Sequence, residues 1–484
     1  MAPRSLSLPE AIELARRNSP TYRQALNDEG PAAAQVRAAY GGFLPSIQSS
    51  LGGGYSRAGR QTLANQIFSQ GSSTISSSYN ISASMGISYA QLLAPAQGKA
   101  QQRMTEENIA TAALSLSTDV TTQYLAALRA DASVRVAEQQ VERNEAFRGQ
   151  AQALYDVGRG NLVEVRQAEV AKANADVQLL RSRQQAVEAR IELLRRMGLP
   201  GGDAATLELS EQFALTEPDW DLAALQSDAR RQHPQLRAAE AREDAADLGV
   251  RSAKSAYLPS LGISTGLSGF TQQATSVDPL IANAVGNAQS AMSNCAFQNA
   301  ILERLTSPHP APNGGIIPDC RAYAGLDESG SRLLPEFEQQ IRDANSGWPF
   351  SFTRQPWSIS VGLSLTIFDG FSREARVSQA RATADDAREA LRDQRLLIDG
   401  QVQSSLLSVE TNWRAAEIAD ANRVAAADQL ALATERYRVG SGTALEVTDA
   451  QNAVTQAEAA YVNAVYDYHT AVALLEAAVG HTLR

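Results

Sequence analysis

Two segments of the chain alternate strictly between apolar and polar residues. One face of the first carries Tyr79, Ile81, Ala83, Met85, Ile87 and Tyr89, and one face of the second carries Trp357, Ile359, Val361, Leu363, Leu365 and Ile367. The residues between them are Ser, Thr, Asn and Gly. Alternation of this length predicts β-strands over 79–89 and 357–367. A weaker strand is predicted over 46–55 and a further strand over 260–269, each preceded by a Leu-Pro pair.

These strands have the properties of membrane-crossing strands. About ten residues suffice for a tilted strand to cross a bilayer, and aromatic residues stand at the strand ends. The small polar face suits a wet lumen, whereas the strand of a soluble sandwich, the alternative, would normally carry Lys or Glu there. Four strands cannot close a barrel, and open strand edges in lipid leave backbone groups unpaired. We therefore expect several chains to combine. No apolar stretch is long enough for a membrane-spanning helix.

Four long helical tracts are predicted over 98–155, 161–197, 372–437 and 443–479. In the third, apolar residues from Val377 to Ala416 are spaced by threes, fours and sevens, which is typical of an alanine-rich coiled-coil seam. A helix of about 60 residues is roughly 90 Å long. Such a rod indicates a spacer or a conduit rather than a catalytic domain.

The chain repeats itself at the level of these elements. Residues 155–165 resemble residues 437–447, and the same offset of 282 maps Gly198 onto Gly480. An offset of 214 maps Pro234 onto Pro20. This self-similarity predicts one unit, a strand pair followed by a helical hairpin, that is used twice.

The first structural repeat is expected over 1–220, with its hairpin at 98–197, and the second over 221–484, with its hairpin at 372–479. The strand-pair offset rises from 214 to 278 across residues 271–356, which marks an insertion of 64 residues. This segment shows little periodicity, so we expect an irregular loop, located outside the cell if the strands form an outer-membrane barrel.

The insertion contains the two cysteines of the chain, Cys295 and Cys320. Two isolated cysteines in one loop favour a local disulfide and an oxidising compartment. A reduced pair in the cytosol is the alternative. Closing a loop of this size would stabilise the folded state by roughly 3 kcal/mol, chiefly by ordering the loop.

The net charge and the absence of known motifs exclude several classes of function. The net charge of −10 leaves no basic surface for nucleic acid. Four scattered histidines, without a Cys/His cluster, P-loop or Gly-x-Ser-x-Gly motif, predict no enzyme, cofactor or metal site. His233 precedes Pro234 at a helix start and is expected to be exposed. We do not expect residues 1–4 to be a signal peptide, and because no cysteine lies near them we expect an unlipidated chain.

The arrangement resembles the TolC-like outer-membrane efflux and secretion factors over nearly the whole chain outside 271–356. The resemblance rests on the Leu8-Pro9-Glu10-Ala11 opening, the Leu-Pro-Ser strand entries, Phe368-Asp369-Gly370 and the two Tyr-x-Val-Gly hairpin tips. It implies an α+β membrane protein in the bacterial outer membrane. The expected assembly is a homotrimer with a twelve-stranded β-barrel in outer-membrane lipid and a helical coiled-coil barrel in the periplasm. The expected partners are a periplasmic adaptor protein and an inner-membrane pump.

The resemblance also implies site residues. Matching by position gives Glu446 and Asp449 as the lining of the tunnel constriction, Tyr437 as a residue that holds the helices closed, and Glu164 as the first-repeat equivalent. Two acids three residues apart share a helical face, and threefold symmetry would gather them into carboxylate rings that select cations. The alternative is that both are ordinary solvated acids.

The hairpin tips are the expected docking points for the adaptor, by the same resemblance. The residues concerned are Val157, Gly158, Val439 and Gly440. The glycines also suit left-handed helix ends. A non-channel structural coiled coil or an adaptor-type periplasmic protein is the alternative function. The sequence leaves the cargo open among drugs, metals, proteins and polysaccharides, so both multidrug efflux and type I secretion stand.

Overall fold

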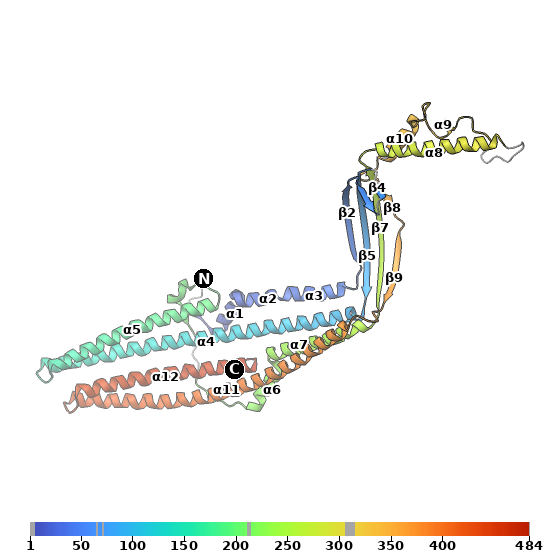
Figure 1. Ribbon diagram of the computed structural model, residues 1–484. Coiled ribbons are helices and arrows are strands. Elements are labelled where there is room, and N and C mark those ends of the chain that lie inside the picture. The colour runs from blue at the N-terminus through green and yellow to red at the C-terminus, as the bar shows by residue number, and fades with distance from the viewer. Residues whose placement is uncertain (1–4, 64–65, 70–71, 211–213, 305–314, 484) are drawn as a thin grey trace. The chain divides into compact units, whose positions relative to one another are not determined.

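The computed structural model describes residues 5–63, 66–69, 72–210, 214–304 and 315–483 (Figure 1). The chain divides into two compact units. A helical unit comprises Met1–Gly41, Tyr89–Tyr257 and Phe368–Arg484, and a strand unit comprises Gly42–Ser88 and Leu258–Ile367. Each unit takes segments from both expected repeats. The expectations about residues 1–4 fall outside the described residues.

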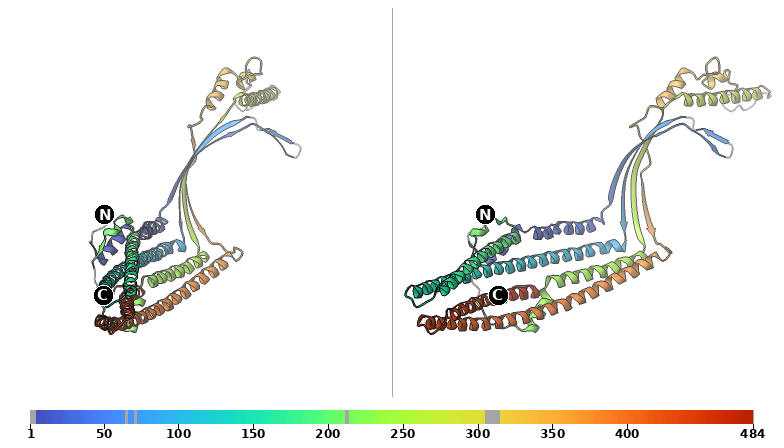
Figure 2. Two further views of the ribbon diagram at one scale, coloured as in Figure 1. Left: turned by 90° about the vertical axis from the view of Figure 1, so that its left-hand side faces the viewer. Right: turned by 60° about the vertical axis from the view of Figure 1, so that its left-hand side comes forward.

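Four long helices dominate the helical unit: α4 (Tyr89–Asp156), α5 (Leu162–Arg196), α11 (Ser372–Arg438) and α12 (Ala444–Val479). α4 packs along α5 and α11 packs along α12, which gives two hairpins, and α4 also packs against α12 (Figures 1 and 2). The four predicted helical tracts are confirmed. α4 begins at Tyr89, earlier than expected, and continues through Pro95.

Shorter elements complete this unit. They are β1 (Ser5–Leu6), α1 (Leu8–Asn18), α2 (Pro20–Asn27), α3 (Glu29–Gly41), η1 (Gly201–Thr206), β6 (Glu208–Leu209), α6 (Leu222–Gln232), α7 (Pro234–Lys254) and η2 (Ser255–Tyr257). β1 pairs in parallel with β6. α7 packs against both α4 and α11, and α3 packs against α4, so the short helices lie along the long ones.

Local sequence explains where the long helices start and stop. The side chains of Asn161 and Thr443 accept hydrogen bonds from the backbone amides three residues on, which caps α5 and α12. Each hairpin's first helix ends before a glycine with positive φ, +74° at Gly158 and +81° at Gly440. Left-handed φ values are open to glycine without steric cost, so both tight turns depend on it.

The returning arms of the hairpins end against the short helices. A Cβ on Gly198 would lie 2.5 Å from the carbonyl oxygen of Asn18, and a Cβ on Gly480 would lie 3.0 Å from the Cα of His233. His233 is buried, so the expectation that it is exposed is wrong. The end of α12 covers this residue, and a residue-level pattern around Pro234 could not show that long-range contact.

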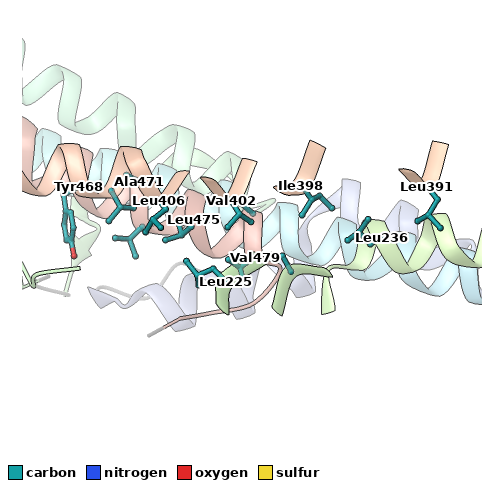
Figure 3. Packing of buried hydrophobic residues seen from close by; sticks show 14 residues of the cluster. Leu225, Leu236, Leu391, Ile398, Val402, Leu406, Tyr468, Ala471, Leu475 and Val479 are labelled. Atoms are coloured by element: carbon teal, nitrogen blue, oxygen red, sulfur yellow. The ribbon is translucent and has the colours of Figure 1, made fainter. Parts of the chain in front are cut away.

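The cores of the helical unit follow the hairpins. In Figure 3, apolar side chains from α6, α7, α11 and α12 meet in one cluster, and among them are Leu225, Leu236, Ile398, Val402, Leu475 and Val479. A second cluster joins α1, α4 and α5, where the buried Tyr124 donates a hydrogen bond to the carbonyl of Leu6 (2.8 Å). These clusters fix the hairpins near the short helices, at a distance from the tips.

The strand unit is an antiparallel sheet. Its strands are β2 (Ser46–Ser56), β5 (Thr74–Ile87), β7 (Ser260–Ala274), β8 (Thr353–Arg354) and β9 (Ser358–Ser364). β2 pairs with β5, β5 with β7, and β7 with β9 and, farther along, with β8. A separate hairpin joins β3 (Arg60–Leu63) and β4 (Gln66–Ser69). The four predicted strands are confirmed in order and type.

The strand boundaries differ from expectation in a consistent way. β5 starts at Thr74 rather than at residue 79 and stops at Ile87, because Tyr89 already begins α4. β7 continues to Ala274, beyond residue 269, and β9 ends at Ser364, before residue 367. Serine-rich and glutamine-rich segments carry little apolar alternation, so pairing with a neighbouring strand decides these ends.

The register aligns like residues across the sheet. Ile47, Ala83, Thr265 and Ile359 form one cross-strand row, and Ser46, Ser84, Ser264 and Ser360 form the adjacent row on the opposite face. Directly paired residues point to the same side, so the sheet has an apolar face and a face of small polar residues. Gly269 is required beside Tyr79, since a Cβ there would lie 2.5 Å from the tyrosine ring.

The insertion is helical over about half of its described residues, so the expectation of an irregular loop is wrong for these parts. It contains α8 (Asp278–Leu302), α9 (Cys320–Tyr323) and α10 (Pro335–Ala344). α8 contributes Ala288, with Ile281, Val285 and Met292 beside it, to a cluster with Leu326 and Leu333. These residues of α8 repeat at helical spacing, a local signal that the expectation of an irregular loop overlooked. The run at 307–312 lies outside the described residues.

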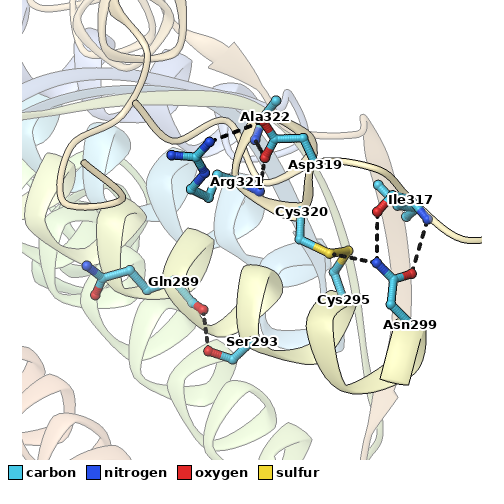
Figure 4. The surroundings of a disulfide bond; sticks show 9 residues. All are labelled: Gln289, Ser293, Cys295, Asn299, Ile317, Asp319, Cys320, Arg321 and Ala322. Atoms are coloured by element: carbon cyan, nitrogen blue, oxygen red, sulfur yellow. Dashed lines mark hydrogen bonds and ion pairs between the residues drawn. A yellow bond between two sulfur atoms is a disulfide. The ribbon is translucent and has the colours of Figure 1, made fainter. Parts of the chain in front are cut away.

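Cys295 and Cys320 form a disulfide that joins α8 to the start of α9, with Cα atoms 5.7 Å apart (Figure 4). One turn further along α8, Asn299 donates a hydrogen bond to the carbonyl of Ile317 (2.8 Å) and accepts one from its amide (3.1 Å). Both interactions tie the segment that follows α8 to that helix.

Candidate functional site

The hairpin tips share a small apolar cluster to which all four long helices contribute. Its buried members are Phe147 and Ala151 from α4, Val165 and Ala168 from α5, Tyr437 from α11, and Ala444 and Val447 from α12. The cluster joins the two hairpins of one chain close to their turns. Because alanines supply much of it, the helices approach closely here.

Tyr437 is the largest polar group in this cluster. Its side chain is 5% exposed and its ring lies 5.5 Å from that of Phe147. The hydroxyl donates a hydrogen bond to Oε2 of Glu164 (3.2 Å), which connects α11 to α5. Burial and the neighbouring Glu164 carboxylate raise the pKa of Tyr437 to about 12, so the hydroxyl keeps its proton at neutral pH.

The same bond orients Glu164. Its backbone amide donates to Oδ1 of Asn161 (3.0 Å), and the Asn161 amide group donates to Glu164 Oε1 (3.3 Å). Asn161 thus caps the start of α5, and its side-chain amide also holds the Glu164 carboxylate. The sequence predicted Glu164 as the first-repeat equivalent of Glu446. In the structure Glu164 is bonded to Tyr437, and because these two residues are 273 positions apart no local pattern could reveal the contact.

Glu446 and Asp449 lie in the first two turns of α12. Glu446 Oε2 is 3.4 Å from Nη1 of Arg436 across the turn, and both side chains are well exposed. Exposed pairs of this kind contribute about 0–1 kcal/mol. Asp449 is exposed one turn further along the helix. The two carboxylates therefore stand on one side of α12 and are accessible to solvent in the single chain.

The two turns present similar surfaces. Val157 and Val439 are exposed at the ends of the first helices of the hairpins. Gly158 and Gly440 follow, and their amides donate to the carbonyls of Tyr155 (2.9 Å) and Tyr437 (3.1 Å). Each tip thus offers one apolar side chain beside a glycine, and this is the surface for which the family resemblance implies docking.

An ion pair that the sequence did not reveal joins the hairpins farther from the tips. The Arg143 guanidinium of α4 donates to both oxygens of Glu458 on α12 (3.0 and 2.8 Å) and to Thr455 Oγ1 (3.3 Å). The Arg143 and Glu458 side chains are 21% and 18% exposed. Gln451 donates to the carbonyl of Arg143 (3.3 Å). Charged residues are frequent in both helices, so the pairing could not be selected from the sequence.

The turn after β9 has an unusual backbone. Phe371 has a φ of +66° and is the one non-glycine residue with positive φ in the part of the chain that the structure describes. This conformation costs roughly 1–2 kcal/mol for an L-residue. Asp369 stabilises the turn, because its carboxylate accepts hydrogen bonds from the amide of Arg373 (3.0 Å) and the hydroxyl of Ser372 (3.1 Å).

Over the described ranges, no group of three or more His, Cys, Asp or Glu side chains is arranged to hold a metal ion. Across those same residues, no helix combines the length and apolar character needed to span a bilayer.

Comparison with known proteins gives a family. The profile of the outer membrane efflux protein family matches residues 11–199 and 321–481. The chain is 27% identical over 278 residues to the pyoverdine export outer membrane protein OpmQ of Pseudomonas putida, which covers 55% of this chain and 58% of that protein. It is 26% identical over 125 residues to nodulation protein T of Rhizobium leguminosarum bv. trifolii. This alignment covers 26% of this chain and 27% of that protein. Both alignments span less than two thirds of the relative.

Solved structures agree on the fold. The outer membrane protein VceC of Vibrio cholerae has a TM-score of 0.70 at 16% identity, covering 99% of this chain and 97% of that one. The CmeC outer membrane channel of Campylobacter jejuni has a TM-score of 0.68 at 16% identity, covering 98% of this chain and 85% of that one. The open state of the MtrE outer membrane channel of Neisseria gonorrhoeae has a TM-score of 0.66 at 18% identity, covering 99% of this chain and 89% of that one.

Proposed function

The chain belongs to the outer membrane efflux protein family, and on that premise we propose that it is the trimeric outer-membrane channel of an export system. Membership makes it an outer-membrane transport protein and not an enzyme. The finer proposal is a channel-tunnel that receives cargo from a periplasmic adaptor and an inner-membrane pump and that opens at its helical tips.

The sheet is the observation that carries this proposal. It has one apolar face and one face of small polar residues, and its outer strands β2 and β9 each pair on one side only within the described residues. Unpaired strand edges are excluded from lipid, because each unpaired backbone group costs several kcal/mol there. Three copies, joined β9 to β2, give a closed twelve-stranded barrel with apolar residues outside and small polar residues around the lumen.

The long helices supply the rest of the conduit. Four per chain give twelve in the trimer, and we place their tips at the periplasmic entrance. There the Tyr437–Glu164 bond holds the two hairpins of a chain together. Glu446, which is partly exposed, and Asp449, which is exposed, would form carboxylate rings when three copies assemble.

Assembly is tested on protein extracted in detergent. The expected species contains three copies, shifts its gel mobility on heating and conducts ions in a planar bilayer. A water-soluble monomer or dimer would overturn the channel proposal and favour the structural coiled coil or the adaptor. Neither alternative accounts for a sheet whose apolar face is left exposed on its outer strands.

The gate residues are tested by ion selectivity. The double variant Glu446→Gln, Asp449→Asn is expected to weaken cation selectivity and block by multivalent cations, because it removes both carboxylate rings. The control variant Glu389→Gln, Asp393→Asn makes the same charge change at exposed positions of α11. Equal selectivity in both variants would place the constriction elsewhere.

Partners and cargo are tested separately. A photoactivatable crosslinker on Val439→Cys is expected to capture a periplasmic adaptor at the tip formed by Val439 and Gly440, and Val157→Cys probes the tip formed by Val157 and Gly158. The same label on Glu389→Cys is the control. The similarity to OpmQ, a pyoverdine export protein, makes a siderophore-type small molecule the first cargo to assay in secretion experiments.

A further inference from the structure

A cavity of about 440 Å³ lies at the base of the first hairpin. It is lined by the start of α2, by the part of α4 around Ala112 and Leu116, and by the end of α5 with Gly198. Gly198 lies directly against the junction of α1 and α2, since a Cβ on this residue would meet the backbone of Asn18. The volume falls in the range of sites that hold small organic molecules, about 300–1,000 Å³.

The start of α2 brings unused hydrogen-bond donors to this cavity. Ser19 is 3% exposed and lines the cavity, yet its hydroxyl makes no cap bond to α2 and has no hydrogen-bond partner among the described residues. The backbone amides of Thr21 and Tyr22, the first N–H groups of α2, have no acceptor in that part of the chain either. Buried polar groups are normally paired, so three unused donors in one place point to a bound acceptor.

The second half of the chain fills the equivalent place with a side chain of its own. The offset of 214 maps Ser19 onto His233 and Thr21 onto Gln235. His233 is the N-cap of α7, and its Nδ1 accepts a hydrogen bond from the amide of Gln235 (3.2 Å). The first half carries a small hydroxyl where the second half carries a ring, so the donors at the start of α2 stay free for a ligand.

Two arginines at the end of α5 add positive charge to the cavity lining. Arg195 and Arg196 both bond to Glu192, and Arg196 is also 3.4 Å from Asp119, the acidic residue of the lining. A guanidinium has five N–H groups, so these bonds leave donors for a further acceptor. The start of α2 contributes the partial positive charge of a helix N-terminus. The group that suits these donors and this charge is an oxyanion.

We propose that the cavity binds a small organic molecule through a phosphate or carboxylate group. The Ser19 hydroxyl and the amides of Thr21 and Tyr22 donate hydrogen bonds to the oxyanion, and Arg195 supplies charge. The apolar body of the ligand covers Leu116. All of these residues belong to the helical unit, so the site does not depend on the proposed barrel or gate.

Binding is measured on the full chain, extracted in detergent, by isothermal titration calorimetry in a buffer free of phosphate and carboxylates. Phenyl phosphate and benzoate distinguish the two head groups, inorganic phosphate lacks the apolar body, and benzyl alcohol lacks the charge. We expect phenyl phosphate or benzoate to saturate at one molecule per chain. Inorganic phosphate is expected to bind about tenfold more weakly than phenyl phosphate, because it leaves the apolar lining uncovered, and benzyl alcohol is not expected to bind.

Three variants test the residues of the site with the organic anion that binds. Ser19→Ala and Arg195→Gln are each expected to weaken binding about tenfold, because each removes a donor to a charged group. Arg183→Gln breaks a similar ion pair elsewhere on α5 and should leave binding unchanged. Ser19→His reproduces the N-cap of the second half and should abolish binding.

The melting temperature separates loss of binding from loss of folding. Because the Ser19 hydroxyl has no partner within the described residues, Ser19→Ala should melt with the wild type when no ligand is present. The proposal is overturned if neither organic anion binds, or if Ser19→Ala binds as tightly as the wild type. Inorganic phosphate that binds as tightly as phenyl phosphate would overturn the organic ligand. If Ser19→His fails to fold, Ser19→Ala and Arg195→Gln decide the question.

Discussion

Replacing Tyr437 by phenylalanine isolates the hydrogen bond that joins the two hairpins. The variant keeps the ring that packs on Phe147 and removes the hydroxyl that donates to Glu164. If this bond holds the tips together, Tyr437→Phe should favour the open state without unfolding the tip. Tyr323→Phe, at an exposed position in the insertion, is the matched control.

The size of the effect follows from the environment of the bond. Hydrogen bonds to charged groups contribute about 1.5–3 kcal/mol. Glu164 is partly exposed, and water can replace the tyrosine, so we expect about 1 kcal/mol per chain. This corresponds to roughly a fivefold shift of the closed–open equilibrium in each chain. If three chains open together, the shift is on the order of a hundredfold.

Single-channel recording in planar bilayers measures this shift as open probability. Tyr437→Ala should open further, because it also removes a buried ring, a loss of about 3–5 kcal/mol in a packed core. A Tyr437→Phe channel that stays as closed as the wild type, while Tyr437→Ala leaks, would show that ring packing and not the hydrogen bond holds the tip.

Alkaline pH gives an independent check on the same residue. The folded pKa of Tyr437 is about 12, above its ordinary value of 10.0. The neutral phenol therefore contributes stability that is complete below pH 10 and is lost as pH rises through about 12. Tyr437→Phe should lose less stability than the wild type over this interval in thermal unfolding at increasing pH.

Three further outcomes are expected. Burial lowers the pKa of His233 below 6.5, so stability that is present above pH 6.5 should fall as the pH drops below it, and His233→Asn should reduce this loss in thermal unfolding. The double variant Cys295→Ser, Cys320→Ser should lose about 3 kcal/mol of local stability, seen as faster proteolysis of the insertion with unchanged conductance. Arg143→Glu should destabilise the paired hairpins by about 2–3 kcal/mol, since it leaves Glu458 without its partner, and adding Glu458→Arg should restore their melting temperature.

Periodic segments were predictable because their pattern is local. The strand alternation at Ile359 and Val361 and the heptad-like spacing from Val377 to Ala416 depend only on side chains a few residues apart. α8 was missed although its pattern is also local. Ile281, Val285, Ala288 and Met292 repeat at helical spacing and pack in one cluster, so the expectation of an irregular loop overlooked a signal that the sequence carries.

The candidate site was predictable only in part. Turn chemistry identified Gly158 and Gly440, and both have the left-handed φ that the turn needs. The Tyr437–Glu164 bond and the Arg143–Glu458 pair connect residues 273 and 315 positions apart, so no short pattern contains them. The lining role of Glu446 and Asp449 depends on neighbouring copies and remains a prediction.

The two tips carry equivalent tyrosine and glutamate residues, but these residues make different contacts. The difference suggests how a trimer would close. Within one chain Tyr437 of the second tip is buried and bonded to Glu164 of the first. The equivalent residues Tyr155 and Glu446 are both accessible. In a ring of three copies the two hairpin types alternate, so the matching Tyr155–Glu446 contact would fall between neighbouring chains. Closure would then depend on assembly, and Tyr155→Phe should raise open probability in the trimer while leaving the unfolding of a single chain unchanged.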